Sequence, residues 1–257
     1  MKLDIKKVNT INDISSWLKY AEPEGGESQW VEGRSAMEFA SYMTSCHGQM
    51  PLEIENYLKC IGVSRKTFIC YPEEVTSFAG YDLGNGSGRH HDGLLISDDF
   101  VVGIEAKVSE PFDLSIKTKM EKAKKNADNG YNMHTRLFNA LKMLNPKFVD
   151  ESLSSVGALM YQLISGTIGT IIESRNRKKN KAAFLIIEFV GDVKRDEKNY
   201  ESKIEANQEA YDDFLDFLNL RDKNDKDRYV DVEGNVRLWI KKLQILIKKD
   251  GCKYCIL

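Results

Sequence analysis

Residues 90–108 read HHDGLLISDDFVVGIEAKV and combine very apolar local sequence with several charged side chains. Two apolar arms flank the Asp-Asp pair at 98–99, which predicts a β-hairpin with a two-residue turn. In that register Asp92 lies directly opposite Glu105. Asp-Asp is a poorer hairpin turn than Asn-Gly. A four-residue loop would preserve the pairing, whereas a loop of odd length would shift it by one residue.

The predicted register brings charged groups together on one face of the hairpin. Directly opposed side chains have Cβ atoms about 4.5–5.5 Å apart, and alternation adds Lys107 to the face of Asp92 and Glu105. Because opposed carboxylates repel, a divalent cation between them is the natural counter-charge, and carboxylate oxygens suit Mg²⁺ or Mn²⁺. Such an ion can activate water for attack on a phosphodiester. Lys107 can orient that water, or accept its proton if burial lowers the lysine pKa.

A second interpretation of these charges needs no metal. The hairpin can present a solvent-facing pair of strands in which Lys107 bridges the two carboxylates. The apolar neighbours favour a buried strand and therefore the metal site: Val101, Val102, Ile104 and Val108. His90 is predicted on the same face and His91 on the other, and a histidine beside a strand is more often structural or exposed than a ligand.

Hydrophobic periodicity outside the hairpin predicts further helices and strands. A helix with the acidic residue Glu38 opens the series, and the strand after the second helix is interrupted by Pro72. The C-terminal strand alternates lysine with apolar residues, which is typical of a protected sheet edge. The predicted helices cover 33–43, 52–62, 117–125, 135–144, 154–175 and 201–220, and the strands 66–78, 182–191 and 236–247.

This arrangement resembles the PD-(D/E)xK nuclease superfamily, in which an aspartate on one strand is followed by a (D/E)xK motif on the next. The matching pieces are HHDGLL with Asp92 and GIEAKV with Glu105 and Lys107. The resemblance covers about residues 34–190. It implies an α/β restriction-endonuclease-like core of helix, three-strand meander, helix and strand, with an extra C-terminal helix and strand. His91 stands where the superfamily often has proline. YQLISGTIGTIIES followed by AAFLIIEFV looks more like an uncharacterised bacterial domain family attached to this superfamily.

The resemblance also implies roles for individual residues. Asp92 and Glu105 match the metal ligands, and Lys107 matches the catalytic lysine. Members often add an acidic residue from the first helix, for which Glu38 is the candidate, although a capping-box glutamate would occupy the same position. Many exonuclease-like members use a polar residue after the third strand, which matches Gln162 in MYQLISG, although polar residues also flank many apolar helix stripes.

Length and composition indicate one soluble globular domain. The chain has 257 residues, 42% apolar and 30% charged, with no internal repeat and no stretch long enough for an interdomain linker. We therefore expect a single domain, 1–257, with a nuclease-like core at 34–190 and C-terminal additions at 191–257.

Charge and cysteine content limit the partners and the compartment. A formal net charge of −2 gives no general attraction to nucleic acid, so binding would depend on the local basic segments 117–125 and 175–181, which can equally be solvated charge. No apolar run approaches a membrane span and the N-terminus lacks a signal-peptide pattern. Five scattered cysteines suit a reducing compartment, and Cys252 and Cys255 form a lone CxxC better explained as ordinary thiols than as a metal site. We expect a cytoplasmic protein without a membrane partner.

The sequence is therefore compatible with two functions. The resemblance implies a metal-dependent phosphodiester hydrolase, a nuclease acting on DNA with Mg²⁺ or Mn²⁺. The alternative is a catalytically silent member of the same fold that serves as a binding or interaction module.

Overall fold

The computed structural model describes most of the chain. The described residues are 1–7, 9–23, 25–64, 66–83, 88–125, 127–191, 199–232, 234–248 and 254–256, with the backbone alone described at 27, 127–132 and 254–256. Cys252 lies outside these residues, so the structure does not test the prediction that Cys252 and Cys255 are ordinary thiols. Within the described residues, no helix combines the length and the apolarity that crossing a membrane requires.

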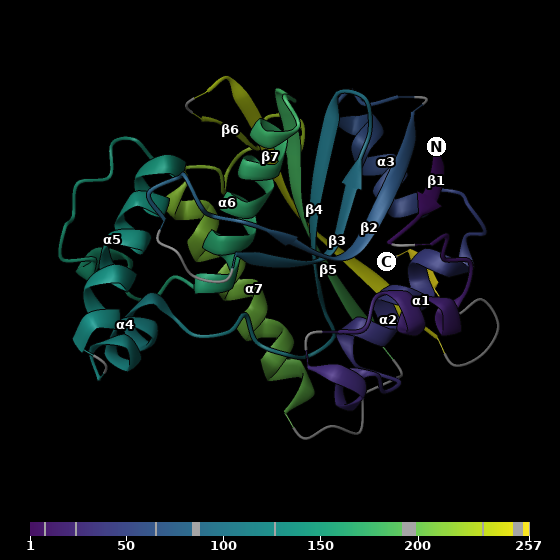
Figure 1. Ribbon diagram of the computed structural model, residues 1–257, viewed down its shortest axis with the longest axis horizontal. Helices are drawn as coiled ribbons and strands as arrows, with labels where there is room; N and C mark the ends of the chain where they lie inside the picture. Colours follow the sequence, from purple (N-terminus) through teal and green to yellow (C-terminus); the bar gives the residue numbers. More distant parts are fainter. Residues whose placement is uncertain are drawn as a thin grey trace.

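One mixed sheet forms the centre of the molecule (Figure 1). Its strand order is β1-β2-β3-β4-β5-β7-β6, and β8 pairs with β7. β2, β3 and β4 form an antiparallel meander, whereas β4, β5 and β7 run parallel. The strands are β1 Lys2–Ile5, β2 Thr67–Thr76, β3 Arg89–Ile96, β4 Phe100–Lys107, β5 Lys181–Gly191, β6 Tyr229–Val232, β7 Val236–Ile247 and β8 Tyr254–Ile256.

Helices cover both faces of the sheet, which confirms the predicted α/β class. α1, α2 and α3 pack on one face and α4 to α7 on the other (Figure 1). Side chains of β4 and β5 alternate between the two apolar layers, which is why these central strands are apolar along their length. The helices are α1 Ile14–Tyr20, α2 Ser35–Ser45, α3 Leu52–Cys60, α4 Ile116–Lys124, α5 Ala127–Leu144, α6 Tyr161–Asn176 and α7 Tyr200–Phe217, with 3₁₀ turns at Gly26–Gln29 and Ser154–Val156.

The central hairpin has the predicted turn. The Ser97 N–H donates to the Phe100 carbonyl at 2.9 Å, so the loop consists of two residues. The register runs as predicted from Ile96–Val101 to Gly93–Ile104. It stops one pair before Asp92 and Glu105, so the prediction that these two residues form a direct cross-strand pair is wrong.

Helix α6 begins later than the sequence pattern predicts. The expected helix at 154–175 starts instead at Tyr161, after a short 3₁₀ turn. Backbone groups of residues 157–161 bond to residues 114–117 around the start of α4: Ile116 N–H donates to the Leu159 carbonyl at 2.8 Å, and Tyr161 N–H to the Leu114 carbonyl at 3.0 Å. These tertiary bonds use the backbone groups that a longer helix would need.

Strand β7 is covered on its second side only at its two ends, which corrects in part the prediction of a lysine-protected sheet edge. It pairs with β5 from Arg237 to Ile247, and its other side pairs with β6 over 236–239 and with β8 over 245–247. Lys242 is buried and forms an ion pair with the buried Glu188 at 2.7 Å. The lysine therefore neutralises a carboxylate inside the protein, a role that the alternating pattern does not reveal.

Glycine at three positions lets α6 approach the sheet closely. A Cβ atom built on Gly166 would lie 2.5 Å from the Phe184 ring, and one on Gly169 would lie 2.9 Å from Arg89 Cγ. On β4, a Cβ atom at Gly103 would lie 2.0 Å from Thr170 Oγ1 and 3.2 Å from His91 Cε1. The low helix propensity of the two helical glycines is therefore offset by close helix-sheet packing.

We expect Gly103→Ala to destabilise the protein by about 1–3 kcal/mol, because the added methyl group overlaps Thr170 and neither backbone can retreat without disturbing the core. Urea unfolding of wild type and variant measures the change. Gly157→Ala is the matched control, since its Cβ would meet only ordinary contacts at 3.5 Å or more and its φ of −59° suits alanine. Equal losses in the two variants would contradict the packing explanation.

Candidate functional site

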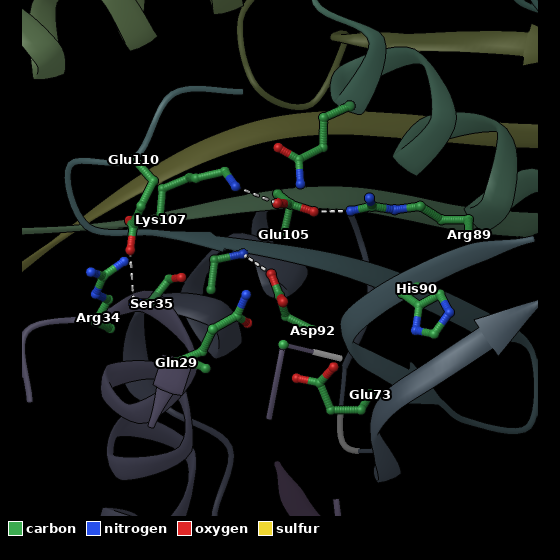
Figure 2. A pocket seen from close by; sticks show the side chains of 14 residues that line it. Gln29, Arg34, Ser35, Glu73, Arg89, His90, Asp92, Glu105, Lys107 and Glu110 are labelled. Atoms are coloured by element: carbon green, nitrogen blue, oxygen red, sulfur yellow. Dashed lines mark hydrogen bonds and ion pairs between the residues drawn. The ribbon is translucent and has the colours of Figure 1, made fainter. Parts of the chain in front are cut away.

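A polar pocket lies at the end of the hairpin opposite its turn (Figure 2). Its volume is about 470 Å³. The first residues of α2, the start of β3, the end of β4 and the first turn of α6 surround it. The lining residues are Gly25, Gln29, Arg34, Ser35, Ala36, Glu73, Arg89, His90, Asp92, Glu105, Ala106, Lys107, Glu110 and Gln162.

A local break in β3 opens the sheet at this pocket. Gly93 faces Phe39 of α2, whereas His91 lies close to Gly103 and to Gly169 of α6, although residues two apart share a face in a regular strand. Asp92, between them, pairs with neither β2 nor β4, and the β2 residue that it would meet, Glu73, has a φ of +48°. This distortion resembles a β-bulge, which re-aims side chains next to many active sites.

Asp92 uses the gap to bond to the next strand. Its Oδ2 accepts a hydrogen bond of 2.6 Å from the Ala106 N–H (Figure 2). Burial raises the pKa of the Asp92 carboxyl, while the Lys107 ammonium and the bond from Ala106 oppose that rise. The carboxyl is therefore held in place by the backbone of β4 and still lines the pocket.

Glu105 is a charged residue in the interior of the protein, with 2% of its side chain exposed. Its Oε1 lies 2.7 Å from Lys107 Nζ, and its Oε2 forms an ion pair with Arg89 Nη2. Figure 2 shows the Glu105 carboxylate between these two cations. A carboxylate so deeply buried is strongly destabilising unless it is paired, so the two cations are a requirement of its position.

Lys107 is almost as buried as its partner. Burial lowers the pKa of the Lys107 ammonium, and the negative charges of Asp92 and Glu110 act in the opposite direction. The neutral amine of Lys107 is therefore more accessible near neutral pH than that of an exposed lysine.

Arg89 is a site residue that the sequence analysis does not predict. It is the first residue of β3, and 11% of its side chain is exposed. Burial lowers the pKa of Arg89, and the nearby Asp92 carboxylate opposes that effect. Its one signal in the sequence is that it lies three residues before Asp92, at a strand end where an arginine is ordinarily solvated.

Gln162 also reaches the pocket, from the first turn of α6. Its Oε1 atom is buried and has no hydrogen-bond partner among the described residues. A buried carbonyl oxygen without a donor costs about 1–3 kcal/mol. The position predicted from the sequence therefore holds an oxygen that is available to a ligand.

Glu38 lies outside the set of residues that line the pocket. It is completely buried, and its Oε1 accepts a hydrogen bond of 2.9 Å from the Gly33 N–H. The carboxylate thus accepts a bond from the backbone ahead of α2, much as the capping interpretation expects, and the cap residue of the helix is Arg34. The structure does not bring Glu38 together with Asp92 and Glu105.

Glu110 is a further pocket residue that the sequence analysis does not predict. Its carboxylate accepts hydrogen bonds from the N–H groups of Val108 at 2.7 Å and Ser35 at 3.2 Å. Because the α2 cap residue makes no side-chain cap bond, Glu110 supplies the acceptor at the start of that helix. It fastens the end of β4 to α2 across the pocket.

Only one of the comparisons with known proteins finds a match. A family model described as a domain of unknown function, DUF6946, matches residues 10–245. The chain belongs to this family. No curated protein and no solved structure gives a match.

The two basic segments lie at different ends of the sheet. In segment 175–181, Lys181 pairs with Phe100 and Lys179 Nζ donates to the Asp98 carbonyl, at the hairpin turn. That end is roughly 17 Å along β4 from Glu105 at the usual rise per residue. Segment 117–125 is nearer to the pocket, because Lys119 lies 4.4 Å from the ring of Tyr161, the residue before Gln162.

The two histidines differ in position. His90 lines the pocket, as predicted, whereas His91 is buried below α6 and shares a hydrogen bond of 3.1 Å with Thr76. Thr76 in turn donates to Glu173 at 3.0 Å. Burial and the Arg89 charge lower the pKa of His91 far enough to keep its imidazole neutral. His91 is therefore part of a buried polar chain between β2, β3 and α6.

The pocket offers oxygen donors that suit a hard divalent cation. No group of three or more His, Cys, Asp and Glu side chains with metal-binding geometry occurs in the part of the chain that the structure describes. The available donors are the carboxylates of Asp92 and Glu105 and the unpaired carboxamide oxygen of Gln162. Mg²⁺ commonly takes only one or two carboxylates and keeps several waters. The donor set therefore fits Mg²⁺ or Mn²⁺, provided that Glu105 exchanges one of its present partners.

We expect Glu110→Gln to lower the free energy of unfolding at pH 7 by about 1–3 kcal/mol, because three backbone N–H donors lose a charged acceptor. Burial alone would raise the pKa of Glu110, but these bonds and the Lys107 charge hold it below the ordinary value of 4.5. The stabilisation is therefore present above pH 4.5 and is lost as the pH falls through the folded-state pKa.

Urea titrations of both proteins from pH 7 to pH 3 measure this effect. The difference between wild type and variant should shrink below pH 4.5. Glu121→Gln, on the exposed side of α4, is the control and should leave the curve unchanged. A difference that stays constant with pH would contradict the assignment.

Proposed function

We propose that this protein is a metal-dependent phosphodiester hydrolase, a nuclease of the PD-(D/E)xK type acting on DNA. One observation carries the proposal: Asp92, Glu105 and Lys107 line a single pocket at the end of the central hairpin. The sequence pattern alone selects these three residues, and their convergence in one pocket is the property that this chemistry needs.

The order of the secondary structure supports a restriction-endonuclease-like core. α2 precedes the β2-β3-β4 meander, and α6 precedes β5, which runs parallel to β4. This is the helix, three strands, helix and strand that the resemblance implies. α4 and α5 are inserted between the meander and α6, and α7 and β7 follow the core.

The metal would be held by Asp92, Glu105 and Gln162, and the proposal names Mg²⁺ or Mn²⁺ because all three donors are oxygens. When bound, such an ion supplies Lewis-acid chemistry that stabilises negative charge on a phosphoryl oxygen. Glu38 takes no part in this arrangement, because its carboxylate is committed to Gly33.

Lys107 supplies the proton chemistry. Its ammonium lies 2.7 Å from Glu105, and burial makes proton loss easier than in water. In the neutral form, the Lys107 amine can accept a proton from the attacking water, and in the charged form it can orient that water. Positioned acid-base groups of this kind contribute about 10²–10⁴-fold to rate.

The pocket mouth favours an anionic substrate. Arg34 is exposed there as the N-cap residue of α2, and the first turn of α6 supplies Gln162. The N-terminal ends of both helices carry partial positive charge toward the pocket. Among the two basic segments, 117–125 is the better candidate for contacts with a nucleic acid backbone, because segment 175–181 lies at the other end of β4.

We expect the purified protein to cleave DNA in the presence of Mg²⁺ or Mn²⁺. Glu105→Gln and Lys107→Met should each reduce the cleavage rate at least 100-fold, because each substitution removes a group that acts on the reacting atoms. Single- and double-stranded DNA and RNA, incubated with each metal and with EDTA, form the assay. Asp99→Asn is the matched control, since Asp99 is a carboxylate on the same hairpin that pairs with Lys66 outside the pocket. Failure to cut any of the four substrates would exclude the proposal.

The rival function is a silent binding module with the same fold. One observation favours it: Glu105 already has two cationic partners, so the described site is electrically satisfied without a metal. A fold that has lost its activity could retain these charges for stability alone.

Metal titration separates the two functions without an activity assay. For a nuclease we expect saturable Mn²⁺ binding, observed as loss of the free Mn²⁺ electron paramagnetic resonance signal. Asp92→Asn and Glu105→Gln should weaken it at least tenfold, and Gln162→Leu less, because a carboxamide is a weaker ligand than a carboxylate. Binding that is absent, or unchanged in both carboxylate variants, would favour the silent module.

A further inference from the structure

Arg89 is held at the pocket by packing as well as by charge. Its stem passes beneath α6 at Gly169, where a Cβ atom would lie 2.9 Å from Arg89 Cγ. Its guanidinium pairs with Glu105 and is also attracted by Asp92. Because the stem is fixed, the guanidinium can leave Glu105 only by rotation about its distal bonds, and it then remains at the pocket that it lines.

The charges at the pocket show what a divalent cation would meet. Immediately around Glu105, Asp92 and Glu105 contribute two negative charges, and Arg89 and Lys107 contribute two positive charges, while Glu73, Glu110 and Arg34 line other parts of the pocket. A divalent cation added beside Glu105 would contact a carboxylate that already bears a guanidinium, and the burial of that ion pair weakens the solvent screening of the repulsion. Displacement of the guanidinium from Glu105 removes that conflict.

We propose that Arg89 is a resident cation that competes with the divalent metal for Glu105 and, once displaced, binds the phosphodiester. The inference rests on the proposed function, because it takes Glu105 as a metal ligand and a phosphodiester as the substrate. A free guanidinium binds phosphate oxygens in a bidentate manner, which a lysine cannot do. Metal binding frees the Arg89 guanidinium for the phosphodiester, and a bound phosphodiester holds the guanidinium away from Glu105. Each ligand therefore raises the affinity of the protein for the other.

Mn²⁺ affinity of the apo protein provides the first test. Arg89→Met keeps the length of the buried stem and removes the charge, and it should bind Mn²⁺ at least tenfold more tightly than wild type, with the gain lost when Glu105→Gln is added. Arg221→Met is the control for net charge, because Arg221 pairs with Asp212 and Asp216 on α7. Equal or weaker Mn²⁺ binding by Arg89→Met, including no binding by either protein, would overturn the proposal.

The wild-type protein gives a second test if Arg89→Met does not fold. The Nε–Hε signal of Arg89 in a ¹⁵N nuclear magnetic resonance spectrum should move saturably with added Mg²⁺, because the guanidinium changes partners. Arg89→Lys identifies the signal by its loss. An Arg89 signal that stays fixed while the Ala106 amide responds to Mg²⁺ would show that metal binds without displacing the arginine, which overturns the proposal.

The phosphodiester role is tested with dimethyl phosphate. Millimolar dimethyl phosphate should raise the Mn²⁺ affinity of wild type, and this coupling should disappear in Arg89→Met. Coupling that is absent from wild type or persists in the variant would overturn this part. These readouts are binding measurements, so their failure is distinguishable from failure of the nuclease assay, which reports cleavage alone.

Discussion

The burial of the Glu105 carboxylate is the constraint on which the rest of the site depends. A charge so far inside the protein must be paired, and β4 alone supplies only Lys107, two residues further along the strand. The second cation comes from Arg89 at the start of β3, which reaches Glu105 because Gly169 leaves room for its stem. The close approach of α6 to the sheet and the electrostatics of the pocket are therefore parts of one arrangement.

The break at Asp92 keeps two carboxylates from pairing directly across the hairpin. A regular hairpin would place Asp92 and Glu105 in direct opposition, where like charges destabilise a sheet. The strand distorts instead, and the Asp92 carboxylate takes the place of a backbone acceptor by bonding to the Ala106 N–H at 2.6 Å. Glu73 in its left-handed conformation and the absence of Asp92 from both strand registers are the local consequences.

The sequence was sufficient for the features that depend on local pattern. The two-residue turn and the register up to Gly93 follow from two apolar arms around 98–99. Asp92, Glu105 and Lys107 line one pocket, as the resemblance implies, but without the direct Asp92–Glu105 pair that the predicted register requires. The remaining features depend on partners distant in sequence. The role of Arg89 depends on its ion pair with Glu105, and the start of α6 at Tyr161 depends on backbone bonds to residues around the start of α4. Hydrophobic periodicity in the sequence predicts neither the ion pair of Arg89 nor the start of α6.

The Gln162 carbonyl oxygen is a donor of the proposed metal site that the folded protein leaves without a hydrogen-bond partner among the described residues. The charged groups of the pocket satisfy one another, so their presence is explained equally well by stability and by catalysis. The Gln162 oxygen has no such partner, and a buried carbonyl oxygen without a donor costs the folded state about 1–3 kcal/mol. Leucine at this position would fill similar volume without that cost. A carbonyl oxygen in the same pocket as two carboxylates can bind a cation or a hydrogen-bond donor that enters the pocket, which is the condition that the proposed metal would meet.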